Sequence, residues 1–244
     1  MKKNVKISIL IASILCVAGL LICTAGLFLM DFDFSKLNTQ PIVTNTHEVT
    51  EDFAHISIQT NTADVVFAVS EDDNCHVVCN ETEKLTHSVR VEGDTLVIQR
   101  EDHRKWYDHI GISIVEYSVT VYLPRFEYAN ISIETDTGDV SVGNVNVTEN
   151  VSIETDTGDV LLRATEVGNK LTVVTDTGDV TLDRADASSI SVTTDTGDVT
   201  GTLLSEKIFF ATSDTGKVQV PKSVNGGECE ITTDTGSIHV EIQK

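Results

Sequence analysis

The residues best suited to chemistry in this chain are aspartates that recur at a nearly fixed interval. The tetrapeptide Asp-Thr-Gly-Asp, or a close variant, occurs six times, with spacings of 20, 20, 19, 19 and 20 residues. Aligned copies would place two rows of acidic groups beside each other. The first row comprises Asp136, Asp156, Asp176, Asp195, Asp214 and Asp234. The second comprises Asp139, Asp159, Asp179 and Asp198, and it lapses at Lys217 and Ser237.

Two classes of enzyme use carboxylates in this way, and neither fits the repeat well. Asp-Thr-Gly is the active-site triplet of aspartic proteases, but those enzymes need two aspartates that share a proton, not six at equal intervals. Polysaccharide-cleaving β-helices cluster carboxylates on one face, yet residues 130–244 contain no Trp or Tyr to stack on sugar rings. We therefore predict no catalytic residue and no cofactor. A carbohydrate-binding or carbohydrate-active β-helix is a lesser alternative.

Calcium is a further alternative for the acidic rows. Carboxylates about 4.8 Å apart repel by about 1 kcal/mol in water and by about 3.5 kcal/mol at an effective dielectric of 20. Ca²⁺ binds six to eight oxygens and could relieve that repulsion, although the known calcium-binding repeat is a shorter, glycine-richer unit. The ligands of such a calcium ladder would be Asp136, Asp139, Asp156, Asp159, Asp176, Asp179, Asp195 and Asp198.

The glycine of each copy predicts a corner in the chain. Glycine adopts positive φ at little cost, and an aspartate two residues earlier can accept a hydrogen bond from the glycine N–H in an Asx-turn. The predicted structural turn glycines are Gly138, Gly158, Gly178, Gly197, Gly216 and Gly236.

Apolar residues flank each corner with a period of two, which is typical of strands with one buried face. In the first copy they are Ile131 and Ile133 before the corner and Val140 and Val142 after it. A unit of about 20 residues cannot bury this face alone, whereas stacked copies share one core. The predicted fold is therefore all-β: a parallel β-solenoid of about 20-residue coils, preceded by one N-terminal transmembrane helix.

The template extends upstream of the regular copies. Residues 55–65 follow it, with Asn61 in place of the first aspartate and Ala63 in place of glycine. We predict irregular N-terminal coils or a cap over residues 50–125 and regular repeats over residues 126–244. The chain ends in the strand after the last corner, so the C-terminal solenoid end is predicted to be a partner or self-association surface, or the most mobile coil.

One stretch outside the repeats has varied chemistry. Residues 101–109 form a predicted protruding loop, and exposed loops often carry binding residues. The candidate contact residues are His103, Trp106, Tyr107 and His109. The cysteines show no zinc-binding spacing, and Cys75 and Cys79 would be too far apart in a strand for a disulfide.

The N-terminus carries an apolar run of 24 residues without charge, from Ile7 to Met30. Such a run is long enough to span a bilayer, and the lysines of residues 1–6 place that end in the cytoplasm. We predict a cytoplasmic N-terminus (1–6), a transmembrane helix (7–30) and a linker (31–49), with the remainder extracytoplasmic. A cleaved signal peptide is the alternative.

The remainder is strongly acidic. Residues 31–244 contain all 38 acidic residues and 14 of the 17 basic ones, a net charge of 14 − 38 = −24. Nucleic-acid binding is disfavoured because phosphates require Lys and Arg. Cationic partners, divalent ions and basic peptides are favoured over anionic ones, and plain solubility of a surface-exposed domain explains the charge better than a specific cationic ligand does.

A resemblance to a known family rests on two segments. Residues 119–124 form a strand ending in Leu-Pro, and residues 131–140 carry the first full repeat. Together they resemble the bacterial family of membrane-anchored β-strand-repeat proteins labelled "putative adhesin", a domain of unknown function, and the likeness covers roughly residues 45–244. It implies a β-solenoid-like domain at the cell envelope and supplies no catalytic residues.

These observations favour a non-enzymatic, membrane-anchored protein that acts as an adhesin-like or scaffold surface, with an envelope or extracellular protein as its partner. The alternative is an accessory subunit of an envelope-stress sensing or regulatory membrane system. The two differ in the partner, which is an extracellular ligand in one case and a neighbouring membrane protein in the other.

Overall fold

The computed structural model describes residues 3–29, 31–32, 41–71, 74–106, 115–124 and 127–243. The chain divides into two units. One contains Met1–Pro41 and Lys105–Val115, and the other contains Ile42–Arg104 and Glu116–Lys244.

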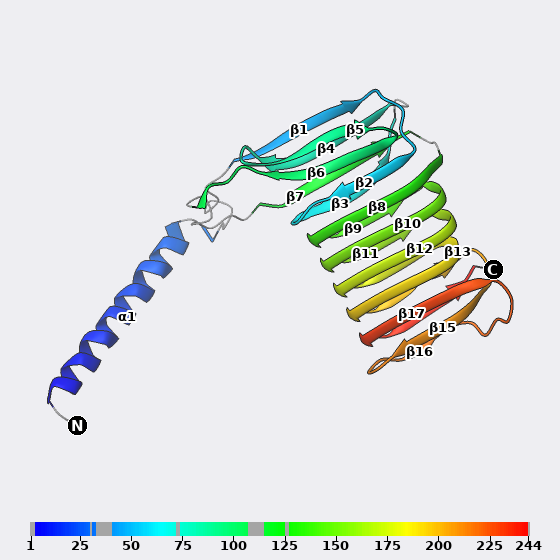
Figure 1. Cartoon of the computed structure of the whole chain (residues 1–244). Coiled ribbons are helices and arrows are strands. Elements are labelled where there is room, and N and C mark those ends of the chain that lie inside the picture. The colour runs from blue at the N-terminus through cyan, green and yellow to red at the C-terminus, as the bar shows by residue number, and fades with distance from the viewer. Residues whose placement is uncertain are drawn as a thin grey trace. The chain divides into compact units, whose positions relative to one another are not determined.

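The first unit contains one long helix, α1 (Lys3–Leu29), shown in blue in Figure 1. Its segment Ile11–Leu29 has a mean hydropathy of 2.4, and none of it is buried in the structure. By length and composition this helix could cross a membrane. A signal sequence near the N-terminus has the same length and composition. These properties therefore establish an apolar helix, and they fit both a retained membrane anchor and a cleaved signal sequence.

The second unit consists of strands joined in one mixed sheet. Its N-terminal strands are β1 (Ile42–Val49), β2 (His55–Gln59), β3 (Ala63–Val69), β4 (Cys75–Thr82), β5 (Leu85–Glu92), β6 (Thr95–Asp102) and β7 (Tyr117–Leu123). The repeats form β8 (Glu127–Thr137), β9 (Val140–Gly143), β10 (Asn146–Thr157), β11 (Val160–Arg163), β12 (Glu166–Thr177), β13 (Val180–Thr196), β14 (Val199–Leu203), β15 (Lys207–Ser213), β16 (Val218–Gln219), β17 (Gly227–Thr235) and β18 (Ile238–Ile242).

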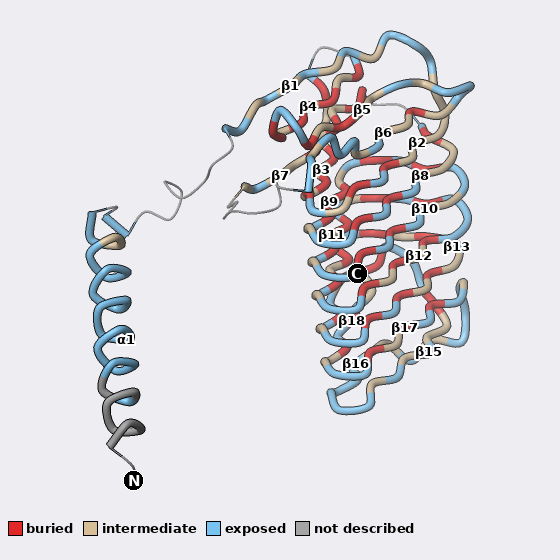
Figure 2. Tube along the Cα trace, turned by 60° about the vertical axis from the view of Figure 1, so that its left-hand side comes forward, coloured by how far each residue is buried: buried red, intermediate tan, exposed pale blue. Residues whose placement is uncertain are grey.

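The repeats stack in parallel, and equivalent residues of successive copies are paired. Val151, for example, lies between Ile131 and Leu171. The predicted inward columns are buried throughout the middle of this stack, as the red segments of Figure 2 show. One column runs through Leu96, Ile56, Ile131, Val151, Leu171, Ile190, Cys229 and Phe209. The shared apolar core expected from the period of two is therefore present.

The stack does not follow chain order at its C-terminal end. The second half of β13 pairs with β17, and β17 in turn pairs with β15. In the same way β18 lies between β14 and β16. The prediction that the C-terminal coil forms the open end is wrong, because the Asp214 copy occupies that place (Figure 1). Burial follows this order: Phe209 and Ala211 of the end coil are only partly buried, whereas Cys229 and Ile231 of the inserted coil are fully buried.

The N-terminal end shows the same kind of insertion. The degenerate Asn61 copy is a true coil, because β2 lies between β6 and β8 and β3 lies between β7 and β9. Beyond it the pairing becomes antiparallel: β5 on β6, β4 on β7 and β1 on β4. The parallel pairing predicted for the solenoid is therefore limited here to β6 on β2 and β7 on β3, and the other pairings of this irregular region are antiparallel. The reason is local, since two-residue turns such as Gly93-Asp94, with a φ of 67° at the glycine, join strands as hairpins.

The predicted linker is also too long. Its residues 42–49 form β1, whose alternate side chains are partly buried against β4. The strand signal in residues 42–49 is weak because Asn45 and His47 occupy inward positions that are usually apolar.

Candidate functional site

The corner glycines are required by the spacing of the coils. A Cβ added to Gly158 would lie 2.1 Å from the carbonyl oxygen of Gly138, and one on Gly178 would lie 2.0 Å from that of Gly158. The φ angles of these two glycines are 156° and 158°, which side chains also disfavour. Gly138, Gly197, Gly216 and Gly236 are crowded in the same way. All six predicted turn glycines thus form one column with no room for a side chain.

The first aspartate of each motif does not close an Asx-turn as expected. The N–H of Gly138 donates to the carbonyl oxygen of Thr157 in the next coil, at 2.9 Å, and Gly158 donates to Thr177 at the same distance. The parallel ladder therefore uses the donor that the Asx-turn would need. Asp136 and Asp156, of the first row, are exposed.

The second row of aspartates ties one coil to the next. The N–H of Asp159 donates to Oδ1 of Asp139 at 2.8 Å, and that of Asp179 donates to Oδ1 of Asp159 at 2.8 Å. The series continues in space through Asp198 to Ser237, whose N–H donates to Asp198 at 2.6 Å. Each carboxylate thus serves the equivalent backbone position of its neighbour. Ser237 and Lys217 occupy the last two places of the stack. Ser237 Oγ accepts from the N–H of Lys217 at 3.4 Å, so serine replaces the carboxylate there, and Lys217 stands in the last coil of the described series.

A column of threonines, which the sequence analysis passed over, lies beside these aspartates. Thr194 Oγ1 donates to the carbonyl oxygen of Gly178 at 3.2 Å, and Thr233 Oγ1 donates to that of Gly197 at 3.0 Å. The column is buried and comprises Thr60, Thr135, Thr155, Thr175, Thr194 and Thr233. Its sequence signal was present, because a threonine directly precedes the first aspartate in five of the six copies.

The acidic rows do not gather their carboxylates as a calcium site would. Within the described part of the chain, just one group of three His, Cys, Asp or Glu residues brings its ligand atoms within 4.8 Å of one another, and it is Cys79, Glu81 and His87. Calcium needs six to eight oxygens around one point. The geometry therefore supports a coil-to-coil hydrogen-bonding role for the aspartates, and calcium binding stays a prediction.

The predicted contact loop is only partly described. His103 Nε2 lies 3.4 Å from Glu101 Oε2, and 78% of Trp106 is exposed. Tyr107 and His109 lie outside the described residues. A contact role for these four residues stays a prediction.

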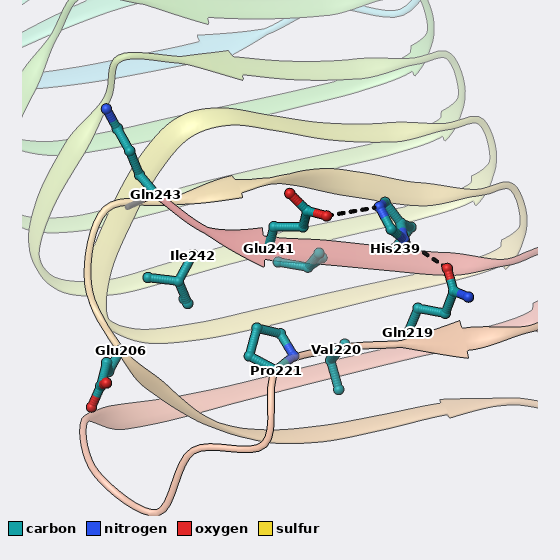
Figure 3. Close-up of a pocket in the computed structure, with 9 residues that line it drawn as sticks. Glu206, Gln219, Val220, Pro221, His239, Glu241, Ile242 and Gln243 are labelled. Atoms are coloured by element: carbon teal, nitrogen blue, oxygen red, sulfur yellow. Dashed lines mark hydrogen bonds and ion pairs between the residues drawn. The ribbon is translucent and has the colours of Figure 1, made fainter.

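The open end of the stack has the features of a binding surface. Among the described strands, β15 pairs only with β17 and β16 pairs only with β18. A groove of about 790 Å³ lies at this end, and Figure 3 shows its side chains. Val220, Pro221 and Ile242 provide its apolar part, and His239 lies between two polar neighbours, 2.9 Å from Gln219 Oε1 and 3.5 Å from Glu241 Oε1.

A buried ion pair links the end strand β15 to β13 in the interior of the stack. Lys207 begins β15, and its Nζ lies 2.5 Å from Asp186 Oδ1 and contacts Ser205 Oγ. Its side chain is 3% exposed and that of Asp186 is 17% exposed. Removing one partner of such a pair leaves an uncompensated charge. Sequence reasoning missed Lys207 because its partner lies in another copy of the repeat.

Residues 53–244 match the family model described as Toastrack DUF4097. The chain belongs to the Toastrack DUF4097 family. This membership confirms the resemblance to a family of unknown function drawn from the repeat and the Leu-Pro strand. No curated protein matches this Toastrack chain.

Three solved structures of bacterial proteins match most of the chain at low sequence identity. A "putative cell adhesion protein" of Clostridium sporogenes is 11% identical, with a TM-score of 0.49, and the match covers 83% of this chain and 100% of that one. A "putative adhesin" of Bacteroides fragilis is 15% identical, with a TM-score of 0.47 and coverages of 84% and 98%. A "Putative lipid binding protein" of Parabacteroides distasonis is 14% identical, with a TM-score of 0.36 and coverages of 82% and 97%.

Proposed function

We propose that this Toastrack protein is a non-enzymatic recognition protein anchored in the cell membrane. Helix α1 is its anchor, with the lysines before it in the cytoplasm. The β unit is a β-solenoid with an antiparallel cap, and it stands outside the membrane. Its open end binds an extended segment of a positively charged protein of the envelope or the cell exterior.

The unpaired edge of β15 carries this proposal. A strand edge with free N–H and C=O groups accepts another strand unless it is covered or blunted, and many recognition domains bind extended peptides in this way. Among the described residues of the β unit, five large apolar side chains are exposed: Ile42, Leu204, Phe210, Val218 and Val224. Four of these five lie between residues 204 and 224, so the apolar surface gathers at the same end as the free edge.

Charge supports the choice of partner. The net charge of −24 over residues 31–244 attracts basic segments and repels a second copy of the chain. The absence of an enzymatic role is supported by the repeat, whose second-row carboxylates are engaged by backbone N–H groups of adjacent coils.

A photo-crosslinking amino acid at Phe210, in intact cells, tests the proposal. Phe210 is exposed on the edge strand, and Glu154 is an exposed control on β10 in the middle of the stack. We expect an adduct with a separate, basic protein from position 210 and none from position 154. Equal labelling from both positions, or none from 210, would refute the docking role. An adduct with a second copy of this chain would show that the surface mediates self-association and does not bind a separate protein.

A further inference from the structure

A second group of functional side chains lies near the antiparallel end of the β unit, far in sequence from the repeats. Cys79 and Glu81 are alternate residues of β4, so their side chains lie on the same face of the sheet. His87 follows on β5 after a short turn. All three side chains are buried, and one ligand atom of each lies within 4.8 Å of the other two.

Hydrogen bonds hold two of these side chains in place. Glu81 Oε1 accepts a hydrogen bond from Asn45 Nδ2 at 2.6 Å, and Oε2 accepts one from the N–H of His87 at 2.7 Å. His87 Nδ1 lies 3.0 Å from Glu81 Oε2, and its Nε2 lies 3.1 Å from Thr60 Oγ1. The side chains of Glu81 and His87 are 1% and 2% exposed. A carboxylate this deeply buried is costly without a nearby cation.

A fourth side chain faces the same cluster. In the pairing of β1 with β4, Asn45 lies opposite Cys79 and His47 lies opposite Val77. Directly opposite residues share a face, so His47 is a diagonal neighbour of Cys79 on the inner face. His47 Nε2 is buried and has no hydrogen-bond partner. Buried nitrogen atoms nearly always have a hydrogen-bond partner or a metal ion bound to them. Because His47 Nε2 has no hydrogen-bond partner among the described residues, it is available to bind a metal ion.

We propose that Cys79, Glu81 and His87 bind Zn²⁺, with His47 Nε2 as the fourth ligand. Thiolate, imidazole and carboxylate are the groups that zinc selects, in a tetrahedral arrangement. Bonds of about 2.0 to 2.3 Å put tetrahedral ligand atoms roughly 3.3 to 3.8 Å apart. The ligand atoms of Cys79, Glu81 and His87 already lie within 4.8 Å of one another. His47, which is not in that group, would approach them from β1 to complete the site.

The surrounding groups suit such a site. Metal-bound histidines normally donate their other ring N–H to a fixed acceptor, and metal-bound carboxylates are themselves hydrogen-bonded. Thr60 is placed to serve His87, and Asn45 serves Glu81. On binding, the Cys79 thiol would release its proton to solvent. With zinc at Nδ1 of His87, the ring proton would be on Nε2, and this N–H would donate a hydrogen bond to Thr60 Oγ1.

One neighbouring positive charge has to be reconciled with a cation at this site. Arg100 lies opposite His87 on β6 and opposes a cation, but its guanidinium is paired with Asp102 at 2.9 Å. The zinc would join β1 to β4 and β5, and would thereby fasten the strand that begins the β unit.

Cobalt is the probe that tests this site, because a Co²⁺–thiolate bond gives a charge-transfer absorption band. The full chain, purified in detergent and reduced, should develop this band with one equivalent of Co²⁺ and lose it on addition of Zn²⁺. Cys79→Ser should abolish the band. Cys75→Ser is the matched control, because Cys75 is a buried thiol on the same strand that lies outside the cluster, and it should leave the band unchanged. Thr60→Val should weaken zinc binding by roughly 10- to 100-fold.

Three results would overturn the proposal: no band in the wild-type chain, a band that survives Cys79→Ser, or a band that disappears in Cys75→Ser. If Cys79→Ser does not fold, a variant in which Cys79 is the sole thiol tests whether Cys79 binds the metal ion. In that variant, Cys16, Cys23, Cys75 and Cys229 are replaced by alanine. A cobalt–thiolate band from it supports the site, and its absence refutes it.

Discussion

At the scale of single residues, the second-row aspartates balance two opposing effects. Neighbouring carboxylates about 4.8 Å apart repel by about 1 kcal/mol in water. A hydrogen bond to a charged acceptor contributes about 1.5 to 3 kcal/mol. Because Asp159 both donates through its N–H and accepts through its carboxylate, each interior aspartate takes part in two such bonds. The second-row carboxylates are exposed, so the water value of the repulsion applies more closely, and the bond then outweighs it by a modest margin.

Replacing Asp159 by alanine should therefore lower the free energy of unfolding by about 1 kcal/mol. The change leaves the N–H of Asp179 without its acceptor. Asp156→Ala is the matched control, because it removes the same charge from the same corner at an exposed first-row position, and it should change stability by less than about 0.5 kcal/mol. Urea denaturation of both variants measures the difference. Equal losses would show that charge, and not the hydrogen bond, determines the effect.

The glycine column predicts a larger effect. Gly178→Ala should destabilise the protein by about 3 kcal/mol or more, because its Cβ would overlap the carbonyl oxygen of Gly158 and the coils would have to separate. Gly143→Ala is the control, since its Cβ would meet nothing closer than 3.7 Å. That variant should be neutral or slightly more stable, through reduced freedom of the unfolded chain. Thermal unfolding followed by circular dichroism compares the two, and similar melting temperatures would contradict close approach at the corner.

At the scale of elements, stacking separates the order of the coils in space from their order in the chain. Every copy presents the same apolar columns, so any copy can pair with any other in register. The last copy is inserted between the Asp195 and Asp214 copies, which leaves β15 and β16 with one neighbour each among the described strands and β18 with two. The C-terminal strand is consequently interior, and the coil before it is the end of the stack.

Hydrogen exchange should reveal this inversion. Amides of β18 should exchange more slowly than those of β15 and β16, although β18 lies next to the C-terminus, because strands paired on both sides open less often. Lys207→Met should accelerate exchange in β15 while leaving β12 unchanged, since it removes the ion pair with Asp186. Mass spectrometry of the full chain measures both effects. Faster exchange in β18 than in β15 would restore the open C-terminal coil that the sequence suggested.

These elements also show how far sequence reasoning reaches. Periodicity predicted the strands, the buried columns, the corner glycines and the Asn61 coil, because each of these depends on local alternation. It could not order the coils, since the repeats are interchangeable, although the lapse at Lys217 and Ser237 marked the end of the stack. The cluster around Cys79 and His87 was missed because it depends on antiparallel pairing between β1, β4 and β5.

At the scale of the whole molecule, one apolar helix precedes an acidic β unit. The helix has no acidic residue in its first turn and no basic residue in its last. All of the chain's acidic residues come after it. This division is typical of a protein that crosses the membrane once and faces an aqueous compartment with its larger part.

Cell fractionation tests whether α1 is retained as that anchor. The full chain should remain with membranes through an alkaline carbonate wash, with a tag at its N-terminus intact and the β unit cleaved by protease added outside the cell. Leu15→Arg and Val17→Arg together, near the middle of α1, should release the chain from the membrane fraction. Each arginine costs about 2.5 to 3.5 kcal/mol of insertion free energy at a helix centre. A mature chain without the tag, recovered from the medium, would instead show that α1 is a cleaved signal sequence. The β unit would then reach its partner as a secreted protein, and the open edge of β15 would remain its docking surface.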